Sequence, residues 1–175
     1  MAVRTVVHYP ARVLKGPAGP VGTIGDGERR IATDLVDTMY DSPGCVGLAA
    51  PQIGVASRAF VLDVSVMKKP PEGNHGLVVL LDPELVVAEG SEIGREGCMS
   101  VPDYTCDVRR ATHVVVSGTT PEGQKRVIEA AGFEARALQH ELDHLDGLLI
   151  LDRVASRRTD VFARKRYAQK GKHLK

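Results

Sequence analysis

The sequence contains one His-Glu-x-x-His pattern, beginning at His140, whose residue types suit a catalytic metal site. Residues four positions apart on a helix share one face, so His140 and His144 can contact a single metal ion. Glu141 stands beside a ligand, where its carboxylate can hold a metal-bound water molecule. Phe133 and Ala137 precede the histidines on the same helical stripe, so we expect the imidazoles to point inward.

A metal site needs a third protein ligand, and the sequence after the motif does not offer a usual one. No glutamate follows Glu141, and the third histidine of an extended HExxHxxGxxH pattern is replaced by Ile150, which cannot bind a metal. Upstream, Cys98 follows Gly97, which permits close backbone approach. A thiolate with two imidazoles leaves a fourth position for water, as in catalytic sites. We therefore expect Cys98 to be the third ligand.

The hydrophobic pattern predicts the elements that must hold these residues. A helix is expected over 132–145, with Gly147 closing it, and others over 27–41 and 156–170. The expected strands cover 58–64, 77–81, 85–88, 111–118 and 124–130. The fold class is α+β: mostly antiparallel strands packed around a central helix that carries the motif, with a C-terminal helix.

Length and composition indicate one ordinary domain. The chain has 175 residues, 43% of them hydrophobic and 26% charged. No apolar run approaches the roughly 20 residues of a membrane span, and no secretory signal is visible. Three cysteines without a CxxC pair argue for a reducing compartment. We expect a cytoplasmic monomer with no membrane contact, made of a catalytic part, 1–152, and a basic segment of the same domain, 153–175.

Charge is distributed unevenly along the chain. Residues 153–175 hold nine Lys or Arg and one acid, a net charge of +8, and the preceding residues carry −7. Such a segment can attract a polyanion such as RNA, although a solvated helix face would have the same composition. The candidate nucleic-acid-facing residues are Arg157, Arg158, Arg164, Lys165 and Arg166.

Three segments, taken together and in order, resemble the peptide deformylase family. They are GCVGLAAPQ at 44–52, EGCMS at 96–100 and QHELDH at 139–144, and the stretch 9–14 is also similar. The likeness extends over about residues 5–155. It implies a hydrolase that removes the N-formyl group from the N-formylmethionine of newly synthesised polypeptides and releases formate, with metal-bound water as the nucleophile. It also suggests the hypothesis that the basic segment contacts the ribosome, because an enzyme acting on chains that leave a ribosome gains from an RNA-attracting surface.

The resemblance also implies residue roles. Glu141 would accept the proton of the water and hand it to the leaving amine. The Gln52 side chain and the Met99 backbone N–H would donate to the reacting carbonyl, each worth about 3–4 kcal/mol. The metal, bound by Cys98, His140 and His144, would be Fe²⁺, replaceable by Ni²⁺, Co²⁺ or Zn²⁺. The sequence departs from the family pattern at Cys45, usually Gly, and at Met99, usually Leu.

The residues of the substrate pocket are harder to predict from the sequence. The candidates for holding the methionine side chain are Val46, Gly47, Phe133 and Ala137, although the last two could be only core residues. Cys45 could narrow the same groove. Further expectations are that Glu96 and Gln139 orient ligands and that Arg110 anchors a loop or the peptide backbone.

Three competing functions stay open at this point. A metallopeptidase that cuts internal peptide bonds lacks its downstream ligand here. A catalytically silent, ribosome-associated metal-binding module would not require Glu141 and Gln52. A structural zinc site would take Cys45, Cys106 or His113 as its fourth ligand, and chelation would then unfold the protein.

Overall fold

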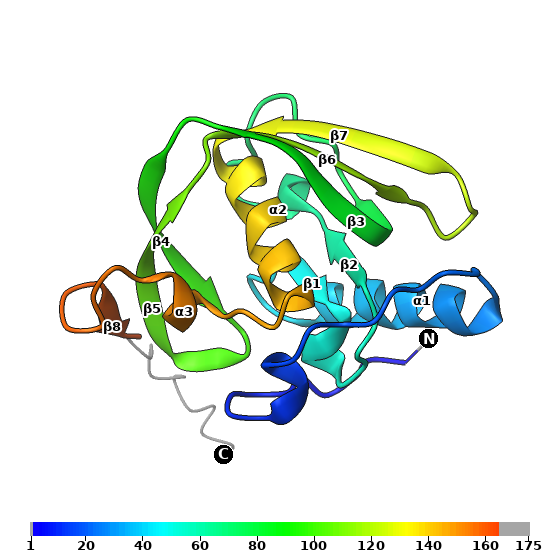
Figure 1. Ribbon diagram of the computed structural model, residues 1–175, viewed down its shortest axis with the longest axis horizontal. Coiled ribbons are helices and arrows are strands. Elements are labelled where there is room, and N and C mark those ends of the chain that lie inside the picture. The colour runs from blue at the N-terminus through cyan, green and yellow to red at the C-terminus, as the bar shows by residue number, and fades with distance from the viewer. Residues whose placement is uncertain (1, 165–175) are drawn as a thin grey trace, which may run out of the picture.

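Two antiparallel sheets surround a central helix in the computed structural model, which describes residues 2–164 (Figure 1). The first sheet has the strand order β1-β2-β3-β6-β7 and the second has the order β4-β5-β8. The first consists of β1 Gly47–Ala49, β2 Ala59–Leu62, β3 Val78–Glu89, β6 His113–Thr119 and β7 Lys125–Ala131. The second consists of β4 Glu92–Cys98, β5 Val101–Arg110 and β8 Val161–Ala163. The prediction of antiparallel strands around the motif-bearing helix is confirmed.

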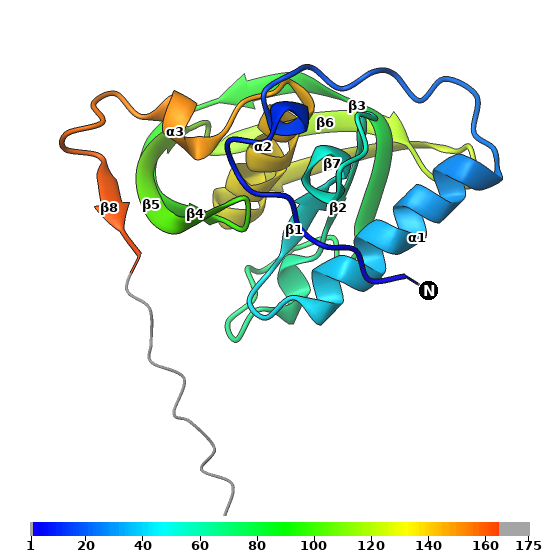
Figure 2. The ribbon, with the colours of Figure 1, turned by 90° about the horizontal axis from the view of Figure 1, so that it is seen from below.

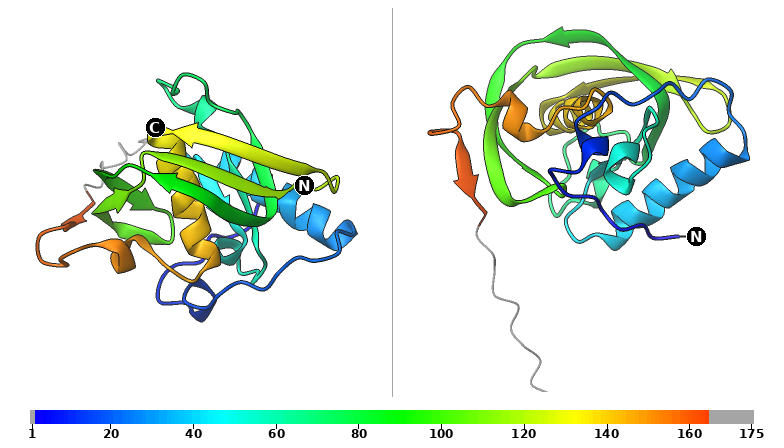
Figure 3. Two further views of the ribbon diagram at one scale, coloured as in Figure 1. Left: turned by 45° about the horizontal axis from the view of Figure 1, so that its top comes forward. Right: turned by 60° about the horizontal axis from the view of Figure 1, so that its bottom comes forward.

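The central helix is α2, Gly132–Leu145, with the bounds that the sequence predicts. Its apolar side, with Leu138 and Leu145 among the buried residues, packs on Phe60 and Leu80 of the five-stranded sheet. Burying one such side chain contributes about 1.5–3 kcal/mol, so the helix is held firmly in place. Figure 3 (right) shows α2 nearly end-on, with strands of both sheets around it. Gly147 follows the helix at φ +75°, as expected of a terminating glycine.

A second helix, α1 Asp26–Asp41, covers the other side of the first sheet. Its buried residues Leu35 and Met39 pack against Leu48 and Val61 of β1 and β2. Figure 2 shows α1 in relation to these strands. The remaining helical turns are short: η1 Arg12–Leu14, η2 Ala50–Ile53, η3 Val64–Val66 and α3 Ile150–Arg153. Among the described residues, no helix combines the length and apolarity that crossing a bilayer requires.

The expectation of two separate strands at 77–81 and 85–88 is wrong. Both belong to β3, which runs through Asp82 and Pro83 with an irregular register against β6. Asp82 takes φ +47°, and its carboxylate accepts hydrogen bonds from the backbone N–H groups of Val21 and Gly22 at 2.7 and 3.0 Å. This tertiary contact stabilises a backbone irregularity within one strand, where the sequence suggests that one strand ends and another begins.

The C-terminal helix expected at 156–170 is also wrong over its described part. Residues 157–159 form a turn, in which Asp160 accepts a hydrogen bond from the Ser156 backbone N–H at 2.9 Å. Strand β8 follows and pairs with Tyr104–Cys106 of β5. Pairing with the distant strand β5 therefore outweighs the local helix propensity of this segment, which becomes an edge strand. Residues 165–170 of that expected helix lie outside the described residues.

Candidate metal centre

The three predicted ligands come together although they lie on two different elements. Cys98 ends β4, and His140 and His144 face it from α2. The Cys98 Sγ atom lies 3.4 Å from His144 Nε2, and the three ligand atoms all lie within 4.8 Å of one another. The His140 and His144 rings meet edge to face, with centroids 5.0 Å apart. One thiolate and two imidazoles at this spacing are a donor set for a single transition-metal ion.

The electrostatics of the cluster favour the thiolate form of Cys98. Burial alone would raise the pKa of this thiol, but His144 and His140 outweigh it and hold the pKa well below its ordinary value. The thiolate is the form that binds metals. The buried Oε2 atom of Glu141 has no hydrogen-bond partner within the described residues. An ionisable thiol, two imidazoles and an orphaned carboxylate oxygen fit a metal ion that carries a polar ligand.

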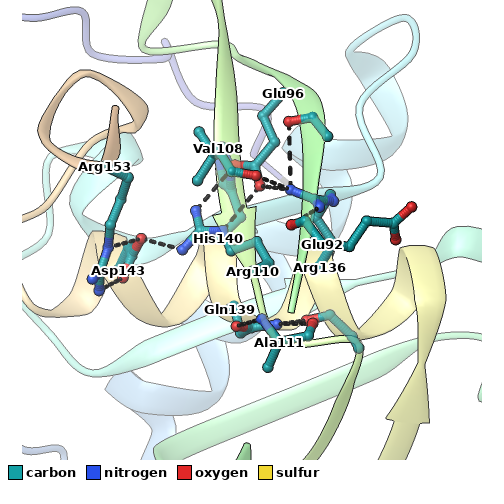
Figure 4. A network of polar contacts seen from close by, with 12 residues as sticks. Glu92, Glu96, Val108, Arg110, Ala111, Arg136, Gln139, His140, Asp143 and Arg153 are labelled. Atoms are coloured by element: carbon teal, nitrogen blue, oxygen red, sulfur yellow. Dashed lines mark hydrogen bonds and ion pairs between the residues drawn. The ribbon is translucent and has the colours of Figure 1, made fainter. Parts of the chain in front are cut away.

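Glu96 orients His140, as expected. The Nδ1 atom of His140 lies 2.9 Å from Glu96 Oε2, so the Nε2 atom is left for the metal (Figure 4). Burial opposes the charge on Glu96, but hydrogen bonds from His140 and Arg110 prevail and lower its pKa to about 2. Arg136 also donates to Glu96, at 2.9 Å. With three cationic or polar partners, the buried Glu96 carboxylate is held in one position and in turn holds the His140 ring.

Arg110 belongs to this buried network and does not anchor a peptide. It donates twice to Glu96, at 2.9 and 3.0 Å, and once to Asp143, at 2.5 Å. Asp143 in turn binds Arg153 at 2.6 and 2.9 Å. The chain of ion pairs thus runs from the protein surface to His140 (Figure 4). The sequence does not reveal that these residues form one network, because they lie far apart in the chain.

Gln139 does not orient a ligand, contrary to expectation. Its side-chain amide exchanges two hydrogen bonds with the backbone of Ala111, both at 3.0 Å, and donates to the Ala135 carbonyl at 2.9 Å. Gln139 therefore ties α2 to the link between β5 and β6. Its contribution is to the placement of the helix.

Glu141 lies between the ligands and β1. It is 4% exposed, and a Cβ atom on Gly47 would stand 2.5 Å from its Oε1 atom. Only glycine at position 47 leaves room for this carboxylate. Burial raises the pKa of Glu141 to about 7, and the two histidines partly offset that effect. A carboxyl group with a pKa near neutrality can both accept and release a proton at physiological pH.

Gln52 is held so that its amide nitrogen faces the ligands. Its Oε1 atom accepts the backbone N–H of Ala49 at 2.9 Å, which places Nε2 3.7 Å from Cys98 Sγ and 3.2 Å from Ser100 Oγ. The η2 turn, which contains Pro51, brings this side chain to the site. Met99 follows Cys98 in the turn between β4 and β5, and both residues line a cavity beside the ligands.

A cavity of about 290 Å³ opens beside the cluster. Glu141, His140, Cys98 and Gln52 are among its polar lining residues. The four residues expected to hold a methionine side chain, Val46, Gly47, Phe133 and Ala137, all line it. Phe133 is 41% exposed, so it stands at the mouth of the cavity and is not a core residue. Ala137 is buried and also belongs to the core cluster around α2.

Two sheet edges border this cavity. Within the described part of the chain, β1 pairs only with β2, and β4 pairs only with β5. Gly47 of β1 and Gly97 of β4 both line the cavity. Unpaired strand edges offer backbone N–H and C=O groups to an extended chain.

The structural zinc alternative finds no fourth ligand among residues 2–164. The ligand cluster there comprises Cys98, His140 and His144 alone. Cys45 Sγ lies 3.1 Å from the Gly47 carbonyl, Cys106 of β5 is buried in the core, and His113 contacts Glu129 at 2.9 Å.

Three of the basic residues expected to face a nucleic acid lie within the described chain. Arg157 and Arg158 lie exposed in the turn before β8, and Arg164 lines the cavity. Lys165 and Arg166 lie outside the described residues.

An inward-facing HExxH helix, a cysteine ligand from an adjacent strand and a buried acid beside them define a metallohydrolase of α+β fold. The family model for polypeptide deformylase matches residues 3–160. The chain belongs to this family, whose members remove the N-formyl group from nascent polypeptides.

Individual members of the family are similar to this protein over nearly the whole chain. A peptide deformylase from Thermodesulfovibrio yellowstonii is 40% identical over 165 residues, which cover 94% of this chain and 97% of the relative. Peptide deformylase 1 of Bacillus subtilis is 40% identical over 91% of this chain and 95% of its own. The crystal structure of a Legionella pneumophila peptide deformylase superposes with a TM-score of 0.80 at 38% identity, over 88% of this chain and 87% of that one.

Proposed function

We propose that this chain hydrolyses the formamide of N-formylmethionine at the start of nascent polypeptides, with Cys98, His140 and His144 holding one divalent metal ion. The observation that carries these assignments is the position of Glu141, buried against the ligand cluster with one carboxylate oxygen unpartnered. A structural metal site has no use for such a carboxylate.

The proposed roles follow from the geometry around the ligands. When bound, the metal ion would supply Lewis-acid activation of water near neutral pH. Glu141 accepts a proton from the attacking water and returns it to the amine that leaves as the C–N bond breaks. The Gln52 amide N–H₂ and the Met99 backbone N–H donate to the carbonyl oxygen as negative charge develops there. Glu96 keeps His140 in one orientation throughout.

The proposed path of the substrate lies between the free edges of β1 and β4. An extended peptide can pair there through its backbone, and its side chains then alternate between two faces. The methionine side chain enters the cavity beside Val46, Phe133 and Ala137. The unpaired edges and the lining of the cavity support this path.

The metal proposed for the native protein is Fe²⁺, and Ni²⁺, Co²⁺ and Zn²⁺ remain alternatives. A mixed set of one thiolate and two imidazoles suits all four ions, so ligand chemistry alone does not select one. Metal analysis of protein purified without oxygen, followed by assay after reconstitution with each ion, distinguishes them.

The proposed setting is the bacterial cytoplasm, where formylated chains are made, and the proposed state is a monomer, because one chain supplies every group of the site. A ribosome contact through the basic segment is part of this proposal. The exposed Arg157 and Arg158 support it. Replacing both by Gln should weaken cosedimentation with ribosomes at low salt; unchanged binding over a salt series would exclude these two residues from the contact.

The experiment that tests the function compares formyl-Met-Ala with casein as substrates for anaerobically purified protein. Formate release from formyl-Met-Ala without cleavage of casein is the expected result. Cleavage of casein would favour the metallopeptidase, and a folded, metal-loaded protein that turns over neither would favour the silent metal-binding module. Unfolding on chelation would indicate a structural site.

A further inference from the structure

We propose that Arg164 and Arg95 form a cationic subsite that favours an acidic side chain at the residue directly after the formylmethionine. The inference deepens the function proposed above and rests on the substrate path between β1 and β4. It concerns the outer face of β4, which the chemistry at the metal centre does not use.

Strand β4 presents different residues on its two faces. Glu96 and Cys98 are buried and point toward α2, whereas Arg95 and Gly97 are exposed on the opposite face. The cross-strand partner of Arg95 is Asp107. An extended peptide alongside β4 has the same alternation. If its first side chain enters the cavity on the α2 side, its second side chain emerges on the face of Arg95 and Gly97.

Arg164 brings a positive charge to that position. It directly follows β8, and its backbone N–H donates to the Asp103 carbonyl at 2.8 Å. Its guanidinium lies so close over Gly97 that a Cβ atom there would collide with Nη2. Arg164 also lines the catalytic cavity. Within the described residues its guanidinium forms no ion pair, and it lines the cavity that would receive the substrate.

Arg95 supplies a second, fixed charge on the same face. Its Nε atom donates to Asp107 at 2.5 Å, and its guanidinium stacks on the Phe162 ring at 3.6 Å from the centroid. The side chain nevertheless remains 48% exposed and lines the cavity, which Asp107 does not. A guanidinium held in one place loses little freedom when it meets a substrate.

The other charged groups that line the cavity do not neutralise this subsite. Glu96 is buried and engaged by Arg110, Arg136 and His140, and Glu141 is buried beside the ligands. Arg136 is occupied by Glu96 and by three backbone carbonyls, so it is not free to bind a substrate. Asp107 pairs with Arg95, so among the described residues the net positive charge that a second substrate side chain meets comes from Arg164.

The test compares three amide-capped peptides, formyl-Met-Glu-Ala, formyl-Met-Gln-Ala and formyl-Met-Lys-Ala, as substrates for the metal-loaded enzyme. The cap removes a terminal carboxylate that would itself be attracted to the arginines. We expect kcat/KM to fall in the order Glu, Gln, Lys, with about three- to tenfold between the first and last at low salt. The difference should shrink when salt rises from about 0.05 M to about 0.5 M.

Variants then assign the preference to residues. Arg164→Glu should invert the order of kcat/KM for the Glu and Lys peptides, and Arg164→Lys should keep that order. Arg95→Gln should reduce the difference in kcat/KM between the two peptides. Arg109→Glu is the matched control, because Arg109 is exposed on β5 and its guanidinium contacts Ser91, away from the cavity. Because each ratio comes from one enzyme sample, a loss of folded protein does not alter it.

Equal kcat/KM for the Glu and Lys peptides in the parent enzyme would overturn the inference, and so would an order that Arg164→Glu leaves unchanged. Turnover of all three peptides without discrimination leaves the proposed function standing. No turnover of any peptide removes the proposed function and this inference together.

Discussion

Gly47 of β1 and Glu141 of α2 meet so closely that any side chain at position 47 would displace the carboxylate. The hypothetical Cβ atom stands 2.5 Å from Glu141 Oε1 and 3.0 Å from Leu62 Cδ1. The edge strand of the larger sheet thus sets the position of the proposed proton acceptor. This relationship explains why a glycine is needed at a strand position with an ordinary backbone conformation.

Gly47→Ala should lower kcat for formyl-Met-Ala by at least about tenfold, because the Glu141 carboxylate must move by a fraction of an ångström. Metal content should not change, since the three ligands are untouched. Gly27→Ala is the control: Gly27 lies in α1 with nothing near its Cβ position, and this change should leave kcat unaltered. Full activity of Gly47→Ala would contradict the tight fit of Glu141 against β1.

Gln52→Glu separates the two hydrogen-bonding functions of this side chain. A glutamate keeps the acceptor for the Ala49 N–H but loses the amide donor that faces the ligands. We expect kcat to fall by about 10²-fold or more, the usual cost of removing one donor to a developing oxyanion. Ser100→Ala, which removes only the 3.2 Å partner of Gln52 Nε2, should have a much smaller effect. Equal losses in both variants would assign Gln52 a structural role only.

Arg110→Met should destabilise the protein by about 3–5 kcal/mol, because it breaks two buried ion pairs and takes the shared cation away from Glu96 and Asp143. Arg110 also holds Glu96, which is the hydrogen-bond partner of His140, so its loss should weaken metal affinity by about 10–100-fold. Urea unfolding and metal competition measure the two effects. Arg109→Met, the neighbouring change on the exposed face, should alter stability by less than about 0.5 kcal/mol.

Tyr40→Phe should make stability less dependent on pH at acid pH. The Tyr40 hydroxyl donates to Asp63 at 2.6 Å, and Ser65 donates at 2.5 Å through its hydroxyl. Burial alone would raise the pKa of Asp63, but these hydrogen bonds outweigh it and lower the pKa. Stability from a lowered carboxyl pKa is fully present above the unfolded value of about 3.9 and is lost as pH falls through the folded pKa.

The corresponding measurement is urea unfolding of both proteins at several pH values. The variant should be less stable by about 1 kcal/mol at neutral pH, and the two curves should converge as Asp63 becomes protonated. A constant difference down to strongly acid pH would show that the hydrogen bond does not act through the pKa of Asp63.

The sequence predicts α2 and its ligands well because both depend on local spacing. A period of 3.6 residues and a terminating Gly147 define the helix, and residues four apart on it share a face whatever the rest of the chain does. Cys98 could be proposed because only a few residue types bind metals. Gln52 and Met99 became candidates through the motifs that surround them.

Pairing between distant segments is what the sequence does not reveal. Strand β8 exists because it completes the edge of β5, and the break expected at Asp82 disappears because that side chain binds Val21 and Gly22. The Arg110 network likewise joins β4, β5 and α2. None of these contacts leaves a local pattern, so composition alone suggested a helix, a turn and a loop anchor in their place.

The most direct test of the central claim is to compare Glu141→Gln with the parent protein for formyl-Met-Ala turnover and metal content on the same samples. The substitution preserves size and leaves the three ligands in place. The account predicts that about one metal ion per chain is retained while kcat falls by about 10²-fold or more. Retention of the metal with undiminished turnover would contradict the role of Glu141 as the proton acceptor.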